Sequence, residues 1–190
     1  MKIKGEKSQT LEEKLKIQLR KICRYAKEYN EMSTPIRSSS MEGVELIGLL
    51  QRTSQSLNKA VCDYENSKIE TIFCKGHSNI PKILWLAIVE RGAIVSMNIS
   101  TVICFGKNGE GIVYGNMEPT RFGVGIHDTV TRTDKPLKID VDGSKAENKY
   151  NDKFINPKEM TYEELDISKL IFDIKNLVNE LPYLKLNQEL

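Results

Sequence analysis

The stretch from Lys75 to Trp85 holds side chains that are well suited to contact a nucleic acid. It joins one predicted strand to the next, and its glycine, serine and proline favour a loop. Lysine side chains and backbone amides can bind phosphates, whereas histidine and asparagine can hydrogen-bond to base edges. The candidate contact residues of this loop are Lys75, Gly76, His77, Ser78, Asn79 and Lys82. The alternative interpretation is a plain surface connection that leads into a core tryptophan.

Two carboxylates near a lysine indicate a second possible chemistry. Asp140 and Asp142 are two residues apart, and Lys145 follows them. Paired carboxylates bind hard cations such as magnesium, so a metal-dependent nuclease is an alternative function. The Asp-Gly-Ser sequence at this point is also typical of an ordinary turn.

The sequence shows no other strong catalytic or metal-binding pattern. It lacks the Gly-x-x-x-x-Gly-Lys-Ser/Thr loop that binds nucleotide phosphates. Its 4 cysteines are far apart and form no Cys-x-x-Cys pair, which favours buried, reduced thiols over a zinc site. Cys74 lies close to His77, but no third group marks a nucleophilic site. We therefore expect a binding protein without catalytic residues, cofactor or metal.

The composition is that of one globular domain. The chain has 190 residues, of which 39% are hydrophobic and 28% charged, enough to build a real core. We expect this core to span residues 10 to 182. The net charge of +2 is too small to identify a partner. No apolar run reaches the roughly 18 residues of a membrane helix, and the start does not resemble a secretory signal. We expect a cytoplasmic protein that does not bind membranes.

Apolar residues at helical spacing predict two helices at the start of the chain. The first 30 residues form one helix, and Thr10 with Glu13 forms its capping box. A serine-rich loop follows over residues 33–40. The second helix covers residues 44–50, and the pattern leaves open whether it continues to Val61.

Short β-branched runs predict a largely antiparallel sheet in the middle of the chain. An Asn-Gly pair at Asn108 and Gly109 is a strong hairpin signal between two of these runs. A late strand over residues 136–141 is a further candidate. The main predicted strands are residues 69–75, 83–89, 99–105 and 112–114.

A closing helix is expected over residues 162–181. Thr161 and Glu164 are its predicted cap, and Pro182 is expected to end it. The order of helices, strands and a last helix predicts an α+β fold, with the closing helix packed on the sheet. An alternative function is protein assembly through the helical apolar stripes, although such stripes are usually core. The stripe residues are Leu11, Leu15, Leu170 and Ile174.

The loop also resembles a known family. Gly76-His77-Ser78-Asn79 and the run from Ile83 through Trp85 to Ile88 are similar to a motif of the N-terminal DNA-binding domain of McrB, the specificity subunit of modification-dependent restriction systems. The strand, turn and strand after Gly92 and the pair Lys149-Tyr150 follow in the same order. The resemblance spans roughly residues 10 to 182, and it is specific only around the loop.

This resemblance implies a module that binds double-stranded DNA, methylated or unmethylated, and flips a modified cytosine into a pocket. His77 would be the wedge that enters the duplex. Trp85 and Tyr150 would be aromatic walls, and Ser100 and Cys104 would be further pocket residues. An AAA+ GTPase module and a nuclease subunit of a restriction complex are the implied partners. The expected basic face comprises Lys75, Lys82, Lys145, Lys149 and Lys153.

The chain departs from the family motif at four positions. His77 replaces a larger aromatic residue, Ser78 a glycine, Leu84 a proline and Ser100 a pocket aromatic residue. A pocket with one wall missing leaves open an alternative, which is sequence-specific binding of duplex DNA through groove contacts without base flipping.

Overall fold

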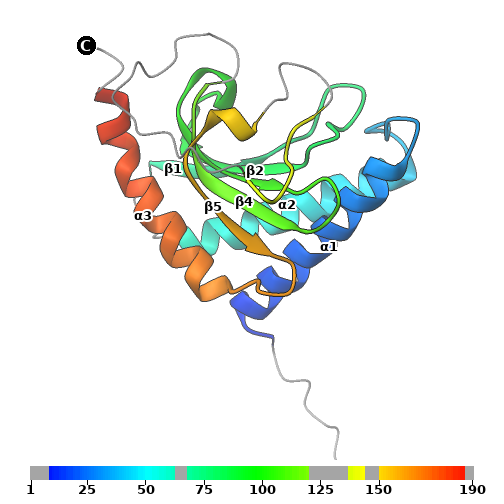
Figure 1. Cartoon of the computed structure of the whole chain (residues 1–190), viewed down its shortest axis with the longest axis horizontal. Helices are drawn as coiled ribbons and strands as arrows, with labels where there is room; N and C mark the ends of the chain where they lie inside the picture. The colour runs from blue at the N-terminus through cyan, green and yellow to red at the C-terminus, as the bar shows by residue number, and fades with distance from the viewer. Residues whose placement is uncertain (1–8, 63–67, 120–136, 144–149, 187–190) are drawn as a thin grey trace, which may run out of the picture.

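The structure is a computed structural model that describes residues 9–62, 68–119, 137–143 and 150–186. Two long helices come first, a sheet follows, and a third helix closes the described chain (Figure 1). This order confirms the α+β fold predicted from the sequence. The helices are α1 (Leu11–Glu31), α2 (Met41–Val61) and α3 (Ile167–Leu186). The strands are β1 (Ile69–Phe73), β2 (Trp85–Glu90), β3 (Ser100–Phe105), β4 (Gly111–Met117) and β5 (Phe154–Thr161).

Side-chain caps mark the beginning of both N-terminal helices. Thr10 and Glu13 form the predicted capping box, in which the Thr10 hydroxyl accepts from the Glu13 amide at 3.2 Å. At the start of α2, the Ser40 hydroxyl accepts from the Gly43 amide at 3.1 Å. The second helix continues to Val61, so its longer predicted extent is the correct one.

The strands pair in chain order as an antiparallel meander, β1-β2-β3-β4-β5. The Asn-Gly pair lies at the β3–β4 turn, as predicted, with Gly109 at a φ of 73°. In the β2–β3 register Trp85 is opposite Cys104. This pairing brings two residues that are distant in sequence to one place on the sheet.

Both faces of the sheet are covered. Leu86 and Ile103 face the helices and join a core with apolar residues of α1, α2 and α3. Ala87 and Val102 face the other way and form a second core with Val141 and its neighbours. Because strands alternate their side chains between faces, this arrangement buries every residue of β3 and β4.

The helical stripes that the sequence raised as an assembly surface belong to the core. Leu15, Leu170 and Ile174 are fully buried against the sheet. Leu11, at the first turn of α1, is the one stripe residue that stays partly exposed. The ordinary interpretation of these stripes is therefore confirmed.

A buried polar network fastens α3 to the sheet. The Asp173 carboxylate accepts hydrogen bonds from the Tyr114 hydroxyl of β4 and from the ammonium groups of Lys158 and Lys169, each at 2.8 Å. Burial alone raises the pKa of Asp173, but these three donors outweigh it and hold the pKa at about 2. The carboxylate therefore stays charged, and α3 is held on the sheet.

The late strand predicted over residues 136–141 is wrong for residues 137–141; Pro136 lies outside the described residues. The amides of Ile139 and Asp140 donate to the carboxylates of Glu159 and Glu110, at 2.7 and 3.1 Å, and not to a neighbouring strand. The strand that pairs with β4 is instead β5, which the sequence did not suggest. Its Asn156-Pro157 pair is typical of a break, and Asn156 has a φ of 47° at an irregular register.

The predicted start of the closing helix is also wrong. Thr161 and Glu164 do form the expected hydrogen bonds, at 3.0 and 3.3 Å, but they stabilise a turn before the helix. The actual cap is Asp166, whose carboxylate accepts from the Lys169 amide at 3.0 Å.

Pro182 lies inside α3 and does not end it, in contrast to the prediction. Leu181 and Leu184 on either side of it pack against Ile99 and Ile155. This apolar contact continues the helix beyond the proline, which removes only one backbone donor.

Candidate functional site

The loop between β1 and β2 lies against the connection between α1 and α2. All residues of the segment 75–79 are exposed. The Ser38 amide donates to the Ser78 carbonyl at 3.0 Å, and an isolated antiparallel bridge pairs Arg37 with Asn79. The loop therefore presents its side chains to solvent from a backbone that is held in place.

The buried side chain of Tyr29 connects the same two segments through hydrogen bonds. The Tyr29 hydroxyl donates to the Ile80 carbonyl and accepts from the Ile36 amide, at 2.5 and 3.2 Å. The Ile80 amide also donates to the Ile36 carbonyl at 3.0 Å. Burial raises the pKa of Tyr29, so the hydroxyl keeps the proton that it donates.

Gly76 makes the tight turn of the loop possible. Its φ is +65°, a backbone conformation that residues other than glycine rarely adopt. A β-carbon at this position would lie 1.9 Å from the Asn79 carbonyl oxygen, which is far inside contact distance. The glycine of the motif is thus required by the backbone.

A hollow of about 510 Å³ opens between the loop and the α1–α2 connection. None of the residues that line it is acidic, and each carries a side chain that can donate a hydrogen bond. They are Arg37, Ser38, Ser39, His77, Ser78 and Asn79. The site therefore suits an anionic or polar ligand. The sequence showed the α1–α2 connection only as a serine-rich loop and did not mark its residues as part of a site.

Lys82 has a different role from the other loop residues, because its side chain binds to the end of α1. Its ammonium group donates to the backbone carbonyls of Tyr29 and Met32, at 2.5 and 2.8 Å, and lies 4.4 Å from the centre of the Tyr29 ring. These contacts satisfy carbonyls at the end of α1. Lys75, by contrast, is exposed beside the Phe73 ring.

Three of the four expected pocket residues meet on the face of the sheet opposite the helices. Trp85 is opposite Cys104, and Tyr150 belongs to the same apolar cluster. Trp85 is partly exposed, whereas Cys104 and Tyr150 are buried. Ser100 is at the other end of β3, buried, with its hydroxyl donating to the Asn98 carbonyl. The structure does not bring Ser100 to Trp85.

The cysteines near the tryptophan are protected thiols. Burial raises the pKa of the Cys74 thiol to about 12, and its sulfur accepts from the Trp85 amide at 3.2 Å. Burial likewise raises the pKa of Cys104 well above its usual range. A protonated, buried thiol is a weak nucleophile, and all 4 cysteines are buried and outside any disulfide.

Asp140 and Asp142 are engaged in local hydrogen bonds and an ion pair. The Asp140 carboxylate forms an ion pair with Lys107 and accepts from the Asp142 amide at 2.9 Å. Asp142 in turn accepts from the Asn151 amide at 3.0 Å. The described residues contain no group of three or more potential metal ligands. Lys145 and Lys149, which belong to the nuclease and basic-face hypotheses, lie outside the described residues.

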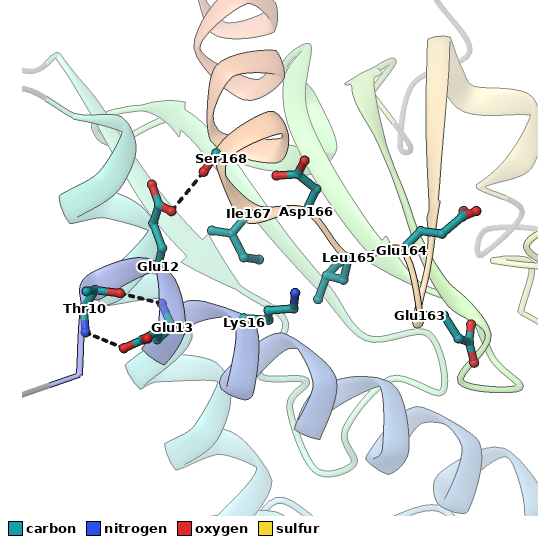
Figure 2. A pocket seen from close by; sticks show the side chains of 10 residues that line it. All are labelled: Thr10, Glu12, Glu13, Lys16, Glu163, Glu164, Leu165, Asp166, Ile167 and Ser168. Atoms are coloured by element: carbon teal, nitrogen blue, oxygen red, sulfur yellow. Dashed lines mark hydrogen bonds between the residues drawn. The ribbon is translucent and has the colours of Figure 1, made fainter. Parts of the chain in front are cut away.

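A second hollow, of about 560 Å³, lies where the start of α1 meets the β5–α3 connection. Half of the 10 side chains that Figure 2 draws around it are acidic, and Lys16 lies among them. Glu12 and Glu13 bond to Ser168 and Thr10, and Asp166 caps α3, so these acids serve local structure. The acidic hollow and the loop hollow are near opposite ends of α1, whose 21 residues span about 31 Å.

No protein-family model matches the chain, and the search of curated proteins found no match. In the described part of the chain, no helix is long and apolar enough to cross a membrane.

Proposed function

We propose that this chain recognises double-stranded DNA through the β1–β2 loop and the α1–α2 connection that supports it. The observation that carries this proposal is the loop hollow, which is lined by hydrogen-bonding and basic side chains without a single acid. DNA presents phosphates and base edges that accept hydrogen bonds from such groups, and an acidic lining would repel the phosphates.

The support of the loop adds to the argument. Tyr29 and the Arg37–Asn79 bridge fix the backbone of a segment whose side chains stay exposed. Binding then orders only side chains, which lowers the entropy lost on association. His77 and Asn79 are the candidates for base contacts, and Lys75 for a phosphate contact.

Recognition of a modified cytosine by base flipping is the finer form of this proposal. The resemblance to the McrB domain motivates it, and the partly exposed Trp85 beside the loop provides an aromatic surface for stacking. Because Cys104 and Tyr150 are buried, a flipped base needs this cluster to open. Any GTPase or nuclease activity is assigned to separate modules or subunits.

Fluorescence anisotropy with labelled duplexes over a salt series tests the proposal. The wild-type protein is expected to bind with an affinity that falls as salt rises. The double variant His77→Ala/Asn79→Ala removes two exposed side chains and is expected to lose at least about tenfold in affinity. Arg91→Ala, an exposed change at the opposite end of β2, is the matched control and should bind like wild type. No binding to any duplex at low salt refutes the proposal.

The fluorescence of Trp85, the only tryptophan, separates flipping from groove recognition. Stacking of a flipped methylcytosine on the indole is expected to quench the emission with a methylated duplex and not with an unmethylated one. Equal binding of both duplexes with unchanged emission rejects base flipping and leaves DNA binding through the loop.

A further inference from the structure

The α1–α2 connection supplies half of the lining of the loop hollow. Arg37, Ser38 and Ser39 come from this connection, and the other three lining residues come from the β1–β2 loop. The two segments are far apart in sequence and meet through the Arg37–Asn79 bridge. A ligand that fills the hollow therefore contacts both segments.

Arg37 is the strongest anion-binding group in this lining. Its side chain is exposed, and among the described residues no hydrogen bond or ion pair occupies its guanidinium. A guanidinium offers a planar set of N–H donors that matches two oxygens of a phosphate. The neighbouring serine hydroxyls and the asparagine amide can donate to the remaining oxygens.

The backbone of Arg37 is fixed on both sides. It pairs with Asn79 in the β-bridge, and its carbonyl accepts from the Ser40 amide at 3.0 Å and the Ser40 hydroxyl at 2.9 Å. The Arg37 side chain therefore projects from a fixed point of the backbone shortly before α2. A group that is positioned before binding loses less entropy when the ligand arrives.

We infer that this hollow is a phosphate-binding site in which Arg37 is the principal contact. The inference rests on the proposed function, because the expected source of the phosphate is the backbone of double-stranded DNA. A hollow of about 510 Å³ is roomier than one phosphate group, so it also admits the adjoining sugar. His77 and Asn79 line the same hollow from the β1–β2 loop, so a phosphate held by Arg37 sets the register of the bases that they contact.

The salt dependence of duplex binding tests the contribution of Arg37. Each phosphate contact adds roughly 0.9 to the slope of log affinity against log salt concentration. Arg37→Ala is therefore expected to reduce that slope by about 1 and to weaken binding roughly tenfold, equally for all sequences. Arg37→Lys keeps the charge and should retain the slope, and Arg91→Ala is the control for the loss of an exposed arginine.

An independent titration uses inorganic phosphate and the ¹⁵N-labelled protein. Saturable shifts of the Ser38, Ser39, Ser78 and Asn79 amides, absent in Arg37→Ala, are expected. Unchanged circular dichroism of the variant shows that it is folded.

The two experiments separate the failure of this inference from the failure of the proposed function. Duplex binding with the same salt slope in wild type and Arg37→Ala, together with no phosphate shifts, overturns the phosphate site and leaves DNA binding intact. Saturable phosphate shifts without any duplex binding support the site, assign it to a free phosphate-bearing molecule, and overturn the proposed function.

Discussion

Replacing Gly76 with alanine is expected to destabilise the protein more than the same change at another glycine of positive φ. Alanine at φ +65° costs about 1–2 kcal/mol because its β-carbon crowds the backbone. At Gly76 the new carbon also meets the Asn79 carbonyl oxygen at 1.9 Å. Because the Asn79 oxygen is a backbone atom and the β-carbon is fixed directly to the Gly76 backbone, the turn itself must open, at a further cost of about 1–3 kcal/mol.

Gly92 provides the matched control. It has a φ of +82°, but nothing lies within 4 Å of the place that a β-carbon would take, so Gly92→Ala carries the conformational cost alone. Both substitutions also stiffen the unfolded chain, by about 0.4–1 kcal/mol, and this effect cancels in the comparison. Gly76→Ala is therefore expected to be less stable than Gly92→Ala by about 1–3 kcal/mol.

Urea unfolding followed by Trp85 fluorescence measures this difference. The same variants in the duplex-binding assay should show weaker binding for Gly76→Ala and unchanged binding for Gly92→Ala, since only the first displaces the loop. Equal stability of the two variants, within about 0.5 kcal/mol, refutes the tight turn and the support it gives to the site.

Two further changes probe contacts away from the loop surface. Asp173→Asn is expected to lower the free energy of unfolding by about 1–2 kcal/mol at neutral pH. Since the folded pKa of Asp173, about 2, lies below the ordinary 3.8, wild type should lose this advantage as pH falls from about 4 to about 2. Equal urea midpoints of wild type and variant at pH 6 would contradict this prediction. Lys82→Met is expected to cost about 1–2 kcal/mol in urea unfolding, because carbonyls at the end of α1 lose their donor, with little change in the salt slope of duplex binding. A reduced slope at normal stability would instead make Lys82 a phosphate contact.

Local signals predicted the first helix and the β3–β4 turn because the interactions that form them are local. Thr10 and Glu13 bond to each other's backbone within one helical turn, and the Gly109 amide donates to the Gly106 carbonyl within the β3–β4 turn. The same Thr-x-x-Glu pattern at Thr161 failed. There Thr161 still belongs to β5 and the Tyr162 amide donates to the Glu110 carbonyl, so a turn over residues 163–164 separates the strand from the helix.

The candidate site was predicted only where it is continuous in sequence. Gly76 to Asn79 stood out as a loop, but Arg37 joins them through a bridge that depends on how α1, α2 and β1 pack. The burial of Tyr29 and the engagement of Lys82 at the end of α1 are likewise tertiary effects. No spacing rule in the sequence reveals such contacts.

The most direct measurement of the central claim is an amide shift map of the ¹⁵N-labelled protein with a short DNA duplex at low salt. DNA recognition by the loop hollow predicts shifts concentrated at residues 36–39 and 75–79, and unchanged amides around the acidic hollow at residues 10–16 and 163–168. Shifts centred on the acidic hollow, or none at any residue, would contradict the account.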